Sequence, residues 1–91
     1  MQISDEARNE FKEITDSIVA DDQAYQTSTG EDDYDAKKNY SVIIMPDFLS
    51  IDYWHLRIKD VPVLEDFAER HGLHMEEVRK DDDIRVVFKK F

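Results

Sequence analysis

Carboxylate side chains are the most abundant groups in this 91-residue chain that could do chemistry, and they are unevenly distributed. The chain has 22 Asp and Glu residues against 12 Lys and Arg residues, a formal net charge of −10 at pH 7. Residues 1–35 hold 11 acids against two bases, a net of −9, whereas the rest holds 11 acids against 10 bases. Such segregation produces a directional field that attracts a basic partner and repels nucleic acid.

Seven of these acids fall on one expected helix. Between Asp5 and Asp22 they span about 27 Å, one per roughly 3.9 Å, against roughly 3.4 Å per charge along one DNA strand. Subtracting the positive charges of Arg8 and Lys12 leaves one net negative charge per roughly 5.4 Å of helix. Two interpretations stay open, a solvated helix face and a surface that occupies the nucleic-acid groove of a basic protein. The predicted partner-binding residues are Glu6, Glu10, Glu13, Asp16, Asp21, Asp22, Glu31, Asp32, Asp33 and Asp35.

The sequence shows no pattern typical of a catalytic, metal-binding or cofactor-binding site. We therefore expect that the protein is not an enzyme and has no catalytic residue, no metal site and no cofactor. The acids of residues 31–35 do not follow the spacing of a calcium loop, and residues 81–83 are typical of a polar hairpin turn. The chain has no cysteine, and its two glycines form no phosphate-binding loop. An acid-base pair of His74 with Glu76 is a third alternative, without a recognisable nucleophile or substrate.

The elements that must position the acids begin with a helix. Ser4 is expected to cap it, and Asp5 and Glu6 favour its first turn. An apolar stripe predicts about 17 residues, with residues 20–26 as a further two turns if the helix continues. A loop over residues 27–39, acidic and mobile, is expected to follow. The stripe consists of Ala7, Phe11, Ile14 and Ile18.

Two hairpins and a second helix complete the prediction. Residues 40–45 are β-branched and apolar, which favours a central strand, and residues 51–59 alternate and should pair with it. A helix of about 10 residues follows Asp60 and ends at Gly72. Residues 73–80 and 84–91 predict a second hairpin with a bulge. Its last strand is expected at an edge, either exposed and guarded by its charges or extending the sheet across a dimer interface. The alternation in the first hairpin places Tyr53, His55, Arg57 and Lys59 on the outer face of the sheet, a rival surface for single-stranded nucleic acid that could equally be solvated or pair with a subunit.

The expected fold class is therefore α+β: one domain over residues 1–91, in the order α-β-β-α-β-β, with two helices on one face of a four-stranded, mostly antiparallel sheet. The start of the sequence lacks a signal peptide pattern, and the longest apolar run covers only residues 42–45. We therefore expect a cytoplasmic protein without a membrane segment.

These features favour a small acidic non-enzymatic inhibitor or regulator. Its partner is expected to be a basic protein, a nuclease or nucleic-acid-binding effector, with DNA mimicry as the specific form and no direct binding of nucleic acid. In size, charge and compactness alone, the chain is similar to phage-encoded anti-restriction and anti-CRISPR proteins and to acidic nuclease-immunity proteins. The alternative is a homo-oligomeric structural or regulatory domain whose acidity serves solubility, so both monomer and homodimer stay open.

Overall fold

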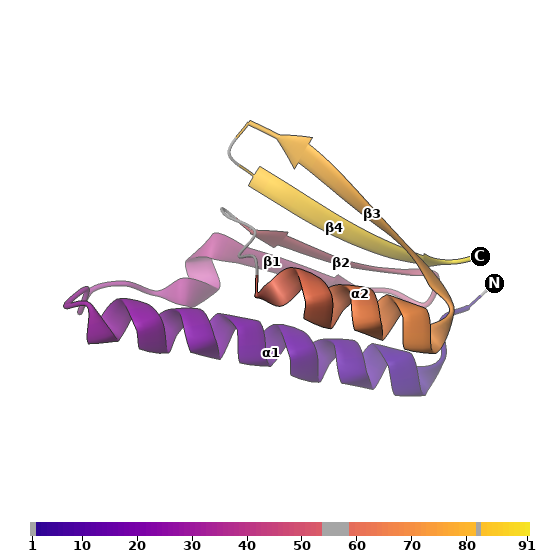
Figure 1. The fold of residues 1–91 in the computed structure, drawn as a ribbon, viewed down its shortest axis with the longest axis horizontal. Helices are drawn as coiled ribbons and strands as arrows, with labels where there is room; N and C mark the ends of the chain where they lie inside the picture. The colour runs from indigo at the N-terminus through magenta and orange to yellow at the C-terminus, as the bar shows by residue number, and fades with distance from the viewer. Residues whose placement is uncertain (1, 54–58, 82) are drawn as a thin grey trace.

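The computed structural model describes residues 2–53, 59–81 and 83–91, and it has the expected two-layer α+β architecture (Figure 1). Two helices, α1 (Asp5–Ser28) and α2 (Asp60–His71), lie beside one another and pack on one antiparallel sheet. The order of the strands across the sheet is β1-β2-β4-β3. Their bounds are β1 (Tyr40–Ile44), β2 (Phe48–Tyr53), β3 (Leu73–Lys80) and β4 (Asp83–Lys90), and a short 3-10 helix η1 (Ala36–Asn39) precedes β1.

Helix α1 begins where the sequence predicts and ends later. The Ser4 hydroxyl accepts a hydrogen bond from the backbone N–H of Ala7 at 3.1 Å, which satisfies one of the free donors at the helix start. The helix then runs for 24 residues rather than about 17, because residues 20–28 contain no glycine or proline to break it. Its last turns extend past the sheet, and Tyr25 is 63% exposed there although it follows the apolar stripe.

Helix α2 has the predicted boundaries to within a residue or two. It covers 12 residues and ends at Gly72, whose φ of 63° lies in the left-handed region that favours glycine. The Gly72 N–H bonds back to the carbonyls of the last turn. The β3–β4 pairing that follows runs without a shift from Leu73–Lys90 to Lys80–Asp83, so the expected bulge is wrong. Val78, which suggested the bulge, lies exposed on β3 and needs no inward position.

The core lies between the helices and one face of the sheet. Three phenyl rings meet at its centre, Phe11 from α1, Phe67 from α2 and Phe88 from β4, with centroids 5.3 to 5.6 Å apart. Each of these side chains is fully buried, so both helices and the central strand share one apolar cluster. This packing fixes α1, and therefore its solvent face, relative to the sheet.

Two strands lie in other places in the sheet than the sequence predicted. The apolar strand β1 lies at an edge of the sheet and not at its centre, and all of its residues after Tyr40 are exposed. Strand β4, expected at an edge, instead lies between β2 and β3. A run of apolar residues predicts a strand, but the order of strands depends on pairings between distant segments, which local patterns do not specify.

The outer sheet face also differs from the prediction. Tyr53 points into the core, 1% exposed, with its ring stacked on that of Tyr40 at 5.3 Å. It follows Leu49 and Ile51 on the inward side of β2, because alternate residues of a strand share a face. Trp54, His55, Leu56, Arg57 and Ile58 lie outside the described residues, and Lys59 is exposed just before α2. The aromatic-basic surface predicted there thus loses Tyr53.

Candidate functional site

The solvent face of α1 carries the first group of predicted binding residues. Glu6, Glu13 and Asp16 all lie on the side of the helix opposite Phe11 and are exposed. Asp16 accepts a hydrogen bond from Lys12 Nζ at 3.0 Å, one helical turn earlier. Glu6 and Glu13 form no ion pair within the described part of the chain. These two carboxylates are therefore the ones that α1 presents without a neutralising neighbour.

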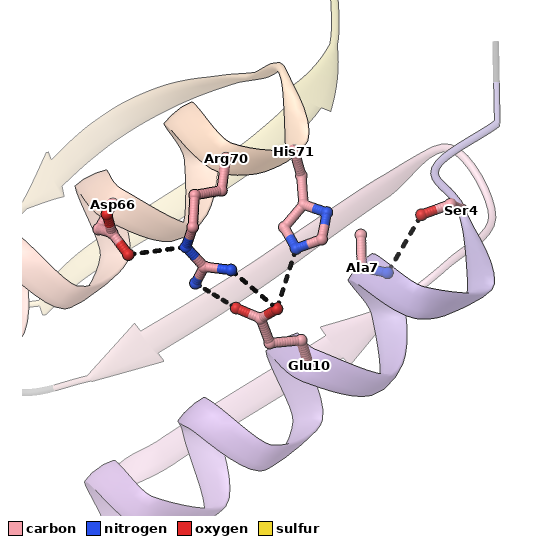
Figure 2. Close-up of polar contacts among 6 residues, drawn as sticks. All are labelled: Ser4, Ala7, Glu10, Asp66, Arg70 and His71. Atoms are coloured by element: carbon pink, nitrogen blue, oxygen red, sulfur yellow. Dashed lines mark hydrogen bonds and ion pairs between the residues drawn. The ribbon is translucent and has the colours of Figure 1, made fainter.

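Glu10 is used inside the molecule. Its two carboxylate oxygens bind both terminal nitrogens of Arg70, and Oε1 lies 3.0 Å from Nε2 of His71 (Figure 2). Arg70 Nε also donates to Asp66 at 2.8 Å. Hydrogen bonds from Arg70, and then from His71, lower the pKa of Glu10 to about 2. Glu10 thus fastens α1 to the last turn of α2.

Asp22 is also turned inward. Its side chain is buried, and the hydroxyl of Tyr34 donates to its Oδ2 atom. Its neighbour Gln23 holds the same segment at two further points, donating to the Tyr34 carbonyl at 2.8 Å and accepting from the Ala36 N–H at 2.9 Å. Asp22 and Gln23 together anchor the chain that returns from α1 to β1.

The acidic loop after α1 is shorter than predicted. Thr27 and Ser28 belong to α1, and Ala36 to Asn39 form the 3-10 helix η1. Asp35 caps η1, accepting from the backbone N–H of Lys37 at 3.2 Å. Between these ends, three acids are exposed and form no ion pair within the described residues: Glu31, Asp32 and Asp33.

Asp21 completes the predicted set. It is exposed on the flank of α1, and its Oδ2 atom lies 3.8 Å from Nζ of Lys59 at the start of α2. Five predicted acids are therefore exposed with no described ion pair, Glu6 and Glu13 on α1 and Glu31, Asp32 and Asp33 beyond its end. We call these five residues the acidic ridge. Glu6 lies about 10 Å from Glu13 along the helix axis, and Glu13 lies about 22 Å from the helix end at Ser28.

The two histidines that the structure describes point in different directions. His71 faces α1 through Glu10, whereas the His74 ring packs against Phe91 with centroids 5.6 Å apart. Gly72 separates the two, as expected from its place at the end of α2. Within residues 2–53, 59–81 and 83–91, no group of three His, Asp or Glu side chains is arranged to hold a metal ion.

The sequence pattern missed the partners of Glu10 and Asp22. One signal was present for Glu10: at 100° per residue it lies on the flank of the apolar stripe, where a second helix packs against the first. No local signal pointed to Tyr34 as the partner of Asp22, because the contact depends on the return path of the loop.

Comparisons with protein-family models, with curated proteins and with solved structures find no match to this chain. No helix in the described part of the structure is both long enough and apolar enough to cross a membrane.

Proposed function

We propose that the chain is a non-enzymatic regulator that binds a basic surface of a nucleic-acid-processing protein through the acidic ridge. One observation carries the proposal: Glu6 and Glu13 are exposed and form no ion pair within the described residues. They lie on a helix whose opposite side packs into the core through Phe11. A carboxylate held in place by a folded scaffold loses less conformational entropy on binding than one on a mobile tail.

The loop acids extend this surface past the end of α1. Glu31, Asp32 and Asp33 follow the end of the helix after two intervening residues, and Tyr34 and Ala36 bond the returning chain to Gln23. We expect a basic surface that is long enough to follow α1 to its end to contact both groups of acids. Lys and Arg side chains that bind phosphates on such a surface also bind carboxylates, without reading bases.

The density of exposed negative charge along α1 is lower than the value from the sequence that suggested DNA mimicry. Glu10 and Asp22 are engaged internally. The acids of α1 that remain exposed, whether or not they are ion-paired, are Asp5, Glu6, Glu13, Asp16 and Asp21. At about 1.5 Å of rise per residue they are spaced roughly 5 Å apart, wider than the roughly 3.4 Å of a DNA strand. The ridge therefore supports binding by charge complementarity, and mimicry of DNA is the narrower form, which requires competition with nucleic acid.

The test is capture of a partner from lysate at low and moderate salt by wild type and two matched variants. Glu6→Lys/Glu13→Lys reverses two ridge charges, and Glu65→Lys/Glu69→Lys makes the same change in net charge on exposed acids of α2. We expect the α2 variant to retain a nucleic-acid-binding protein that the ridge variant loses. Release of that protein by added DNA would support mimicry. Equal retention by all three proteins would remove the ridge as the binding surface.

A further inference from the structure

The two edges of the sheet carry different side chains. Strand β3 has four charged residues among its eight, Glu76, Glu77, Arg79 and Lys80. Strand β1 has none, and Met45 follows it directly. Charged side chains on an edge strand prevent pairing with another strand, whereas an uncharged apolar edge permits it. Of the two edges in the described sheet, β3 is therefore protected and β1 is not.

The apolar side chains of β1 are accessible on both faces of the strand. Val42, Ile43, Ile44 and Met45 are between 37% and 44% exposed. Alternate residues point to opposite faces, so Val42 and Ile44 lie on the helix side and Ile43 and Met45 on the open side. A contiguous apolar patch that the fold leaves exposed at an edge is typical of an interaction site.

The backbone of β1 also offers hydrogen-bonding groups at this edge. The Met45 N–H donates to the Phe48 carbonyl at 2.9 Å, so Met45 points its backbone toward β2. Hydrogen-bonded and non-hydrogen-bonded residues alternate along an antiparallel pair. Ile43 therefore also bonds toward β2, while Val42 and Ile44 direct their N–H and C=O groups away from it, toward the free edge.

The charges around β1 are balanced, although this half of the chain is acidic. Residues 1–53 contain four bases. Arg8 and Lys12 lie beside Ile44 in a shallow groove at this edge, where Arg8 pairs with Asp5 of the same groove and Lys12 pairs with Asp16. Lys37 and Lys38 lie in η1 directly before β1, and Asp47 follows the strand. Two copies, each with a net charge of −10, therefore repel one another less at their β1 edges than at the acidic ridge.

From these four observations we propose that β1 pairs antiparallel with β1 of a second copy, with the twofold axis at Val42. Val42 then exchanges both backbone hydrogen bonds with Val42 of the partner subunit, and Ile44 lies opposite Tyr40 of the partner subunit. Two four-stranded sheets become one continuous sheet.

Charge favours the antiparallel orientation. Lys37 and Lys38 precede β1 and Asp47 follows it, so antiparallel pairing directs the basic end of one β1 toward the acidic end of the other. The contact uses neither Glu6 nor Glu13, and so it stands independently of the ridge. Because β1 has only five residues, the pair buries less than the ~1,200 Å² of a stable interface, and we expect a reversible dimer.

Sedimentation over a range of roughly 10 μM to 1 mM tests the pairing. We expect the mass of wild type to rise from 10.8 kDa toward twice that value with concentration. Val42→Lys places two like charges at the axis and should stay monomeric. Val78→Lys puts the same charge on an exposed apolar residue of the other edge, and should dimerise like wild type.

Two further measurements keep the test decisive if Val42→Lys fails to fold. Ile43→Lys changes the open face of the same strand and should also abolish the dimer. Since the chain has no cysteine, Val42→Cys should be joined to itself by a short bis-maleimide, and Val78→Cys should not. A wild type that stays monomeric at every concentration, even if β1 captures a strand of another protein, would overturn the proposal. Dimerisation of both lysine variants of β1 would also overturn it.

Discussion

The Nε2 atom of His71 lies 3.0 Å from Oε1 of Glu10, 61 residues earlier in the chain. The same carboxylate binds the guanidinium of Arg70, so one side chain of α1 holds two consecutive residues in the last turn of α2. That turn is the negative end of the α2 dipole, where cationic side chains are favoured. Glu10 completes this arrangement from outside the helix and fixes how α1 and α2 sit against one another.

Glu10→Gln should lower the free energy of unfolding by about 1 kcal/mol, the upper end for a partly exposed ion pair, because two donors lose their charged acceptor. Glu13→Gln is the matched control on the same helix. It removes an exposed carboxylate without an ion pair in the described residues, and should change the stability by less than about 0.5 kcal/mol. Urea unfolding measures both. Equal effects would mean that the Glu10 contacts add nothing to stability.

The Glu10 contribution should depend on pH in a defined window. Its pKa is about 2 in the folded protein against 4.5 for the free side chain, so the unfolded state binds the proton more tightly. The stabilisation is thus fully present above about pH 4.5 and is lost as the pH falls toward 2. Unfolding of wild type and Glu10→Gln at pH 7, 5 and 3 should give a difference that is constant between pH 7 and 5 and smaller at pH 3. An unchanged difference at pH 3 would contradict the assignment.

The parts of the fold that local chemistry determines were predictable. The Ser4 cap, the inward side of α1 and the end of α2 at Gly72 each follow from residues within a few positions of one another. The length of α1 was underestimated because the apolar stripe weakens after Ile18, whereas the helix continues until Gly30 is near. An apolar stripe shows only which part of a helix contacts the core. A helix that extends past the core keeps its backbone hydrogen bonds although it has no apolar stripe there.

The candidate site was predictable only in part, for a different reason. Composition located the acids, and the helical period placed Glu6 and Glu13 on the solvent face. Whether an acid stays free depends on residues far away in sequence: Arg70 and His71 for Glu10, and Tyr34 for Asp22. The position of β1 at an edge has the same origin, because β4 pairs with β2 from the far end of the chain. A count of acids in the sequence therefore gives only an upper limit on the number of exposed, unpaired acids on the folded surface.

Gly72 gives the last prediction, which concerns the turn between α2 and β3. Its φ is 63°, and a Cβ atom there would meet nothing within 4 Å, so a substitution is penalised by backbone strain alone. Gly72→Ala should therefore lower the free energy of unfolding by about 1 kcal/mol, and Gly72→Asn by less, since asparagine tolerates the left-handed region better. Thermal unfolding ranks the two variants against wild type. An alanine variant as stable as wild type would mean that this turn does not hold the left-handed conformation in solution.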